Sequence, residues 1–271
     1  MVPDDIRLVR PDDYTGEGRS RGLARGLLAY YGELNLTAEG MGIGGVALKD
    51  RYGTCFSRSW KDSEECGLFK RTFCLDTRLV WGIGGRPVPL LSWPIQLYTD
   101  AYMKMPWLQN RILAPALKLR TMAGIMPLFI TIPSRGTVTL TYEISGGHAQ
   151  IHASSTVQAG PGERLCILNE LSAAHFTSGW DGEHLVPPPP GWDEVSHAQL
   201  PVSLADPSHG VRFFIDKPQA DPGSPYRIYQ GRENTGDLCW AGFCIELGPL
   251  NSSGTFPELK YQVGLALEPF P

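Results

Sequence analysis

The clearest alternation of apolar and polar residues in the chain lies between residues 137 and 157, and it predicts a β-hairpin. Two arms flank Gly146-Gly147, a pair that suits a tight two-residue turn. Such a turn pairs Ser145 with His148, and this register places the apolar sides of the arms opposite each other. The apolar positions are Val138, Leu140, Tyr142 and Ile144 on the first arm and Ala149, Ile151, Ala153 and Val157 on the second.

The other side of this hairpin is polar and has two interpretations. The same register pairs Glu143 with Gln150 and Thr141 with His152. This side faces solvent, as one side of an antiparallel sheet commonly does, or it forms the polar lining of a cavity.

Similar patterns predict strands along most of the chain. Residues 45–49 and 54–60 predict one further hairpin, and residues 68–75 and 78–83 another that turns at Asp76-Thr77. Residues 21–34 fit a short helix or a strand. Residues 164–171 predict a more fully buried strand, residues 191–209 a long polar loop, and residues 211–216, 226–230, 238–247 and 259–268 four more strands.

Residues 86–130 differ from the rest because they are apolar, aromatic, rich in methionine and punctuated by proline. Short helices are expected at 95–104 and 108–122, the second kinked at Pro115. Three interpretations stay open for the region. It covers the open end of a barrel, it contacts a membrane or a second subunit, or it is an ordinary buried connection.

Together these patterns predict a mostly β fold, an antiparallel barrel or sandwich with a few short helices around residues 95–122. The 31 glycines and 23 prolines agree with many turns. A single domain over residues 1–271 is expected, possibly built of two packed β halves at about 21–130 and 131–271. In its broad plan, antiparallel β with a covered apolar cavity, the chain is similar to calycin and lipocalin barrels, an analogy of architecture only.

Charge and cysteine usage narrow the class of protein. The net charge of −4, without a cluster of lysine and arginine, argues against nucleic-acid binding. No apolar run is long enough for a transmembrane helix. The acidic N-terminus lacks the apolar core of a secretory signal, so a cytoplasmic location and six free, buried cysteines are expected.

The familiar cofactor and metal patterns are missing or incomplete. Gly40, Gly42 and Gly45 satisfy a dinucleotide-binding spacing, but the next turn follows too soon for the helix that such a site needs. His148 and His152 lie on one side of a predicted strand, about 13 Å apart, too far to share an ion. The sequence therefore predicts neither a cofactor nor a metal site.

Candidate catalytic residues come from the titratable groups in or beside the apolar strands. Glu170 lies within the predicted buried strand, where burial would raise its pKa and suit it to general acid or base catalysis. His175 follows in a polar segment, and Glu143 and His152 are the corresponding pair on the central hairpin. Methionine and aromatic residues are the candidates for the lining of an apolar cavity. They are Tyr142, Trp93, Trp107, Met103, Met122 and Trp180.

Three functions are compatible with these features. The first is a cofactor-independent enzyme, an isomerase or cyclase, that moves a proton on an apolar small molecule held in a β-barrel cavity. The second is a carrier that binds such a molecule without chemistry. The third is an interaction module that uses residues 86–130 for peripheral membrane contact or for homo-oligomer formation.

Overall fold

The structure is a computed structural model. It describes residues 5–11, 17–19, 23–38, 40, 42–50, 53–88, 122, 124–188, 191–220, 225–235, 238–249 and 254–270. Within these ranges the regular structure is almost entirely antiparallel β, as predicted, with one 3-10 turn, η1 (His197–Gln199). The helices expected around residues 95–122 lie outside the described residues, except for Met122. Among the described residues no helix has the length and apolar character needed to span a membrane.

The strands form three sheets. The small sheet has the order β1 (Ile6–Val9), β3 (Leu28–Tyr31), β4 (Leu34–Asn35). The nine-stranded sheet has the order β10 (Arg86–Pro87), β9 (Thr77–Ile83), β6 (Gly53–Phe56), β5 (Ile43–Asp50), β14 (Arg164–Leu171), β22 (Leu238–Leu247), β21 (Tyr226–Thr235), β17 (Gly191–Val195), and β11 (Ile125–Thr131) also pairs with β9.

The eleven-stranded sheet is the largest. Its order is β16 (Leu185–Val186), β15 (Ser178–Trp180), β18 (Val202–Asp206), β19 (Val211–Ile215), β23 (Leu259–Leu267), β13 (His148–Ser155), β12 (Thr137–Ser145), β8 (Leu68–Cys74), β7 (Ser59–Glu65), β2 (Glu17–Arg19), and β20 (Gln219–Ala220) also pairs with β23. In each large sheet, the first and last of the described strands in the order do not pair with each other. Neither sheet therefore closes into a barrel.

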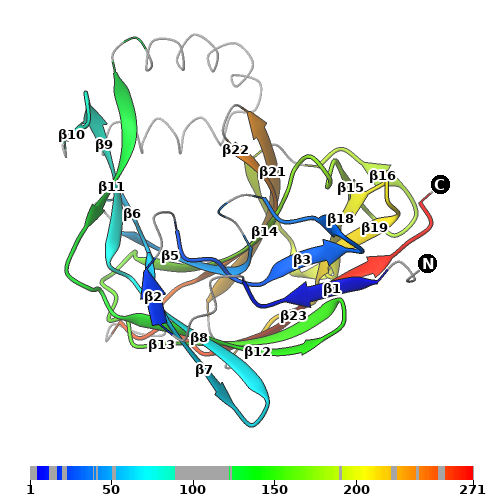
Figure 1. The fold of residues 1–271 in the computed structure, drawn as a ribbon, viewed down its shortest axis with the longest axis horizontal. Coiled ribbons are helices and arrows are strands. Elements are labelled where there is room, and N and C mark those ends of the chain that lie inside the picture. Colours follow the sequence, from blue (N-terminus) through cyan, green and yellow to red (C-terminus); the bar gives the residue numbers. More distant parts are fainter. Residues whose placement is uncertain are drawn as a thin grey trace.

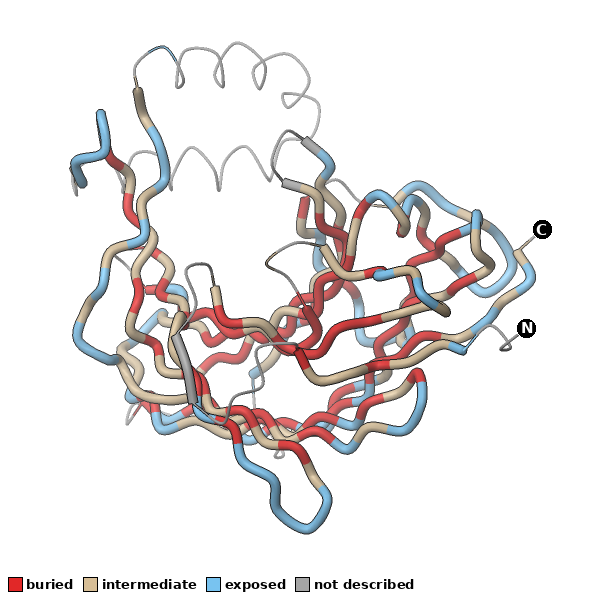
Figure 2. Tube along the Cα trace, in the orientation of Figure 1, coloured by how far each residue is buried: buried red, intermediate tan, exposed pale blue. Residues whose placement is uncertain are grey.

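The main core lies between the two large sheets, in a sandwich-like arrangement. In Figure 1, β8, β12, β13 and β23 lie below β5 and β14. Figure 2 shows buried residues concentrated along the facing strands. Leu140 and Tyr142 of β12, Ile167 of β14 and Val263 of β23 belong to one buried apolar cluster. Strands from the ranges 21–130 and 131–271 pair directly, β5 with β14 and β8 with β12.

The central hairpin is confirmed with its register. Strands β12 and β13 pair Ser145 with His148 and Tyr142 with Ile151. Gly146 has a φ of 56° at the turn, a conformation that a two-residue primed turn requires and glycine adopts without strain. The alternation and the turn specified the same pairing, which is why the register could be predicted.

The hairpin expected from residues 68–83 is wrong. Both strands form, as β8 and β9, but they belong to different sheets. The chain crosses between the sheets at fully buried Leu75 and at Asp76, whose carboxylate accepts a hydrogen bond from the Ser59 hydroxyl at 2.6 Å. A crossing and a turn have the same local sequence signature, because both interrupt the alternation with polar residues. The predicted strand 54–60 divides for the same reason, into β6 and β7.

Residues 191–209 are not a long loop. They contain β17, η1 and β18. The strand residues of β17 pair with β21 at the edge of the nine-stranded sheet, where polar side chains such as Asp193 and Glu194 are exposed. An edge strand with a polar exposed side lacks the alternation on which the prediction depended.

The glycine-rich segment contains a strand bulge at residues 43–45 and not a dinucleotide-binding helix. The pairing of β5 with β14 shifts register at Leu168 and Asn169. Gly44 has a φ of 90°, and a Cβ there would lie 2.4 Å from the Tyr142 hydroxyl oxygen. The glycine is therefore required by close packing against the central hairpin.

Candidate functional site

The nine-stranded sheet has a second side, turned away from the main core, which we call the outer face. Cys166 of β14, Ala47 of β5 and Cys244 of β22 form a small buried cluster there. Figure 1 shows β9 with β11 rising at one side of β5 and β14, and β22 with β21 rising at the other. Because side chains alternate along a strand, Glu170 shares this face with Cys166, whereas Asn169 points into the core and accepts a hydrogen bond from Tyr261 at 3.0 Å.

The positions beside Glu170 on the next two strands are glycines. Its partner on β22 is Gly242, and the next position across the sheet, on β21, is Gly231. On the other side, the Glu170 backbone N–H donates to the carbonyl oxygen of Gly42 at 3.0 Å. A Cβ at Gly242 would lie 2.0 Å from the Asn169 carbonyl oxygen, so the close approach of the strands requires glycine. Glu170 is therefore the one residue of this row on β14, β22 and β21 that carries a carboxyl group.

Two stacked indoles lie at the end of this row. Trp192 of β17 pairs with Gly231, and its ring stacks on Trp240 of β22 with centroids 4.1 Å apart and planes at 21°. Strands β17 and β22 are separated by β21, so their side chains meet only by leaning across it. The missing side chain at Gly231 provides the space. The outer face therefore carries both a buried carboxyl group and a pair of stacked indole rings.

Burial determines the protonation of Glu170. The residue is 8% exposed, and no hydrogen bond or ion pair to its carboxyl group occurs among the described residues. Burial alone raises the pKa of Glu170 from its ordinary 4.5 to about 7. Beside it lies a hollow of about 30 Å³, lined by residues that include Gly42, Gly45 and Phe56, with room for about one water-sized group. Near neutral pH this carboxyl group can both give and accept a proton.

The other predicted catalytic pair lies elsewhere. Glu143 and His152 are on the side of the eleven-stranded sheet that faces away from the core. Glu143 is exposed, and His152 Nε2 lies 3.0 Å from a carboxylate oxygen of Glu258, itself largely exposed. Among the described residues, no hydrogen bond or ion pair joins Glu170 to Glu143, His152 or His175. Glu143 and His152 thus share one face of the central hairpin, whereas Glu170 lies in β14 of the other large sheet and His175 in the loop after it.

The predicted cavity residues are also dispersed. Tyr142 is fully buried and stacks on Phe69, with centroids 5.4 Å apart, at the floor of a depression beside β1. Trp180 packs edge-on against Phe270 and borders a partly polar hollow with Gln199 and Gln230. Met122 is exposed. The remaining three, Trp93, Met103 and Trp107, lie outside the described residues.

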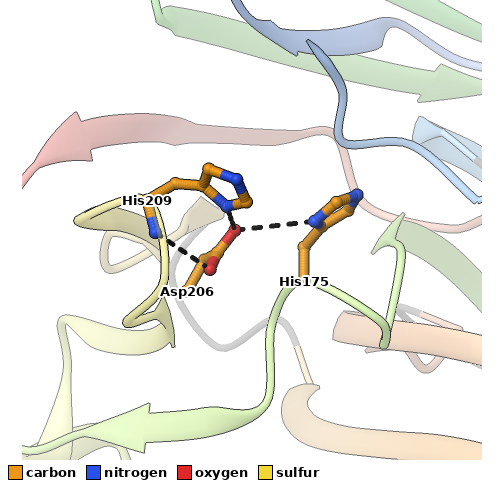
Figure 3. A group of neighbouring side chains, drawn as sticks. All are labelled: His175, Asp206 and His209. Carbon is orange, nitrogen blue, oxygen red and sulfur yellow. Dashed lines mark hydrogen bonds and ion pairs between the residues drawn. The ribbon is translucent and has the colours of Figure 1, made fainter.

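His175 belongs to a different cluster, with Asp206 and His209 (Figure 3). Asp206 Oδ2 is 2.7 Å from His209 Nδ1 and 3.6 Å from His175 Nδ1. The sequence pattern did not identify His209 or Asp206 as site residues. The usable signal was Asp206 at the end of an apolar strand, three residues before a histidine, a spacing typical of a tight turn closed by an aspartate.

All six cysteines are free thiols, as predicted, but they are not uniformly buried. Cys66 is exposed, while Cys55, Cys166 and Cys244 are buried. A hydrogen bond with the Cys244 thiol lowers the pKa of Cys166, and the adjacent Lys49 ammonium lowers it further. These thiols pack beneath Phe56, Leu168, Trp192 and Tyr229. They form part of the floor of the outer face.

Comparison with known proteins gives no family for this chain. No known family model matches the sequence, and no curated protein matches it. The functional argument therefore depends on the geometry of the site.

Proposed function

We propose that the protein is an enzyme that moves a proton on an apolar small molecule, without a cofactor, with Glu170 as the general acid or base. The reaction class is isomerisation or cyclisation, in which a proton leaves one position of the substrate and returns at the same or another. The observation that carries the proposal is a buried carboxyl group, without a hydrogen-bonding or charged partner among the described residues, beside a small hollow. Burial without a partner costs free energy, and such groups are concentrated at functional sites.

The titration behaviour of Glu170 supports this role. With a pKa of about 7, both protonation states are populated near neutral pH. Proton transfer is most effective when the pKa of the catalytic group is close to the working pH. The small hollow beside Glu170 suits the reacting atom and its immediate substituents.

The stacked Trp192 and Trp240 support a planar or unsaturated apolar substrate. Indole faces bind such molecules through dispersion and through their quadrupoles. Gly231 and Gly242 lie between the indoles and Glu170 in the same row of the sheet. A substrate that contacted both the indoles and Glu170 would have its reacting atom fixed relative to the carboxyl group.

The proposal places the ligand on an open sheet and not inside a closed lipocalin-type barrel, since the described sheets do not close. It also assigns no catalytic role to Glu143 or His152. The carrier function is the alternative. It would use the same face and indoles but would not need an ionisable group there.

A co-purification experiment tests the proposal. The protein and its Glu170→Gln variant are purified from the native host, and bound small molecules are identified by native mass spectrometry. The identified molecule, or a host extract that contains it, is then incubated with each protein in D₂O. We expect deuterium incorporation or conversion by the wild type, and loss of at least about 100-fold of that rate in the variant with binding retained.

Glu143→Gln is the matched control, because it removes an exposed carboxyl group from the other sheet and should leave the rate unchanged. Equal turnover by wild type and Glu170→Gln would refute the assignment of Glu170. Binding of the same unchanged molecule by both proteins, without deuterium exchange, would establish the carrier function.

A further inference from the structure

The side chains of His175, Asp206 and His209 converge from two separate segments of the chain (Figure 3). His175 lies in the loop after β14, and Asp206 ends β18, with His209 in the following turn. One nitrogen or oxygen atom from each of the three lies within 4.8 Å of the other two. Within the described part of the chain, this is the one place where three such groups meet. Two imidazoles and one carboxylate are a common ligand set for a first-row divalent metal ion.

Hydrogen bonding alone does not account for the arrangement. His209 Nδ1 is at hydrogen-bond distance from Asp206 Oδ2, but His175 Nδ1, at 3.6 Å, is beyond it. Ligand atoms around a tetrahedral zinc ion lie about 3.3 Å apart, given bonds of about 2.0 Å. The two measured separations lie on either side of that value. A small rotation of the imidazoles would give the spacing that an ion needs.

The carboxylate is already oriented. Asp206 is 1% exposed, and its Oδ1 accepts hydrogen bonds from the backbone N–H groups of Ser208 at 3.1 Å and His209 at 3.3 Å. Oδ2 is therefore directed at the two imidazoles. Backbone donors that fix a carboxylate in this way are typical outer-shell partners of metal ligands.

The loop that carries His175 is anchored as well. Arg232 of β21 donates to the carbonyl oxygens of Phe176 at 3.1 Å and Ala173 at 2.7 Å, and the Phe176 ring is fully buried. His175 thus projects from a fixed segment toward Asp206. The His175 and His209 side chains keep 21% and 36% of their surface exposed, which gives an ion and a bound water access from solvent.

We propose that His175, Asp206 and His209 bind a divalent transition-metal ion, Zn²⁺ by preference, with a water molecule as the fourth ligand. Nitrogen and carboxylate ligands in a set of three, with one open position, fit zinc best among the common ions. The site is independent of the function proposed for Glu170. Among the described residues, no hydrogen bond or ion pair joins its three side chains to Glu170.

The chain contains a natural control for the aspartate–histidine turn. Asp181 Oδ1 accepts hydrogen bonds from the backbone N–H groups of Glu183 at 2.8 Å and His184 at 2.7 Å, and His184 Nδ1 lies 3.9 Å from Asp181 Oδ2. The spacing matches that of Asp206 and His209. This pair is mostly exposed, however, and no second imidazole approaches it among the described residues. If the three-residue geometry determines binding, only the Asp206 cluster should hold the ion.

Metal binding by the full chain tests the proposal. The protein carries Cys66→Ser to remove the exposed thiol, is stripped with EDTA, and is titrated with ZnCl₂ by calorimetry and with CoCl₂ by visible absorption. We expect one equivalent of zinc and tetrahedral cobalt bands without thiolate charge transfer. His175→Gln and His209→Gln should each weaken binding by at least about tenfold, and His184→Gln should leave it unchanged.

Circular dichroism establishes that each variant is folded before titration. Asp206→Asn retains the shape of the side chain, so it reports loss of the charged ligand if a histidine variant fails to fold. Absence of stoichiometric binding, equal binding by His175→Gln and the parent, or cobalt bands with thiolate character would each overturn the proposal.

Discussion

Two buried carboxyl groups, Asp62 and Glu170, differ in whether neighbouring residues compensate for their burial. The Asp62 carboxylate is fully buried and forms two hydrogen bonds of 2.7 Å with Arg71, whose side chain is also fully buried. The guanidinium carbon lies 4.9 Å from the centre of the Trp60 ring. Glu170 is nearly as buried, but among the described residues it lacks a hydrogen-bonding or charged partner. The first group is fully compensated and the second is not.

This difference distinguishes a buried group that stabilises the fold from a buried group that is suited to a function. Asp62 and Arg71 satisfy each other, and Arg71 also donates to the Arg25 carbonyl oxygen at 2.8 Å, so the pair links β7 and β8 to the chain before β3. Because the two side chains bind each other, a pair of this kind is poorly suited to binding a ligand. Glu170 carries a desolvation cost that a substrate proton could relieve.

Breaking the compensated pair is expected to have the largest effect on stability. Asp62→Asn removes the carboxylate that forms two hydrogen bonds with the buried Arg71 guanidinium. We expect a loss of about 3–5 kcal/mol in the free energy of unfolding, measured by urea denaturation at pH 7.

The matched control removes both charges. Asp62→Leu combined with Arg71→Met should cost clearly less than Asp62→Asn, because no uncompensated charge is left behind. If the single variant lost less than about 1 kcal/mol, water or another group would have to replace Asp62, and the contrast with Glu170 would disappear.

The contrast also shows where prediction from sequence ended. Burial of Glu170 followed from its place in the apolar strand 164–171, and the absence of a partner did not. The neighbours of Glu170 across the sheet are Gly242 and Gly231, and both lie on strands more than 60 residues downstream. The register of β12 with β13 was predictable because both arms and the turn are local, whereas β8 and β9 went to different sheets through a crossing that no local pattern distinguishes from a turn.

The Asp206 cluster was missed for a related reason. His175 and Asp206 are far apart in sequence, and the segment between them was interpreted partly as a loop. Metal-ligand spacing within a motif is visible only when the ligands lie close together along the chain. Convergence from β14 and β18 depends on the pairing of the strands between them.

Changing pH should reveal the uncompensated carboxyl group, with the next largest effect. Burial raises the pKa of folded Glu170 from its ordinary 4.5 to about 7, so the folded protein binds the Glu170 proton more tightly than the unfolded chain does. Its contribution to stability is therefore full below about pH 4.5, falls as the pH rises, and is lost above about pH 7. The stability of the wild type relative to Glu170→Gln should fall by about 3 kcal/mol over this interval.

Urea unfolding of the two proteins at a series of pH values measures this difference. Glu143→Gln controls for the removal of an exposed carboxyl group, and its difference curve should change far less, since water solvates that side chain in both states. A difference curve for Glu170→Gln that stayed flat, or rose with pH, would mean that Glu170 has a charged partner in solution.

The exposed pair of His152 and Glu258 should have the smallest effect, and it completes the comparison. Its atoms lie 3.0 Å apart, as close as many buried pairs, but both side chains are solvated. Exposed ion pairs contribute little, because water already stabilises the separate charges and ordering two side chains costs entropy. We expect His152→Ala to change the free energy of unfolding by less than about 0.5 kcal/mol in urea, and to leave any turnover of the substrate unchanged. A larger loss of stability would show that distance determines the strength of polar pairs in this protein. A loss of turnover alone would indicate that the active site lies on the polar side of the central hairpin and not at Glu170.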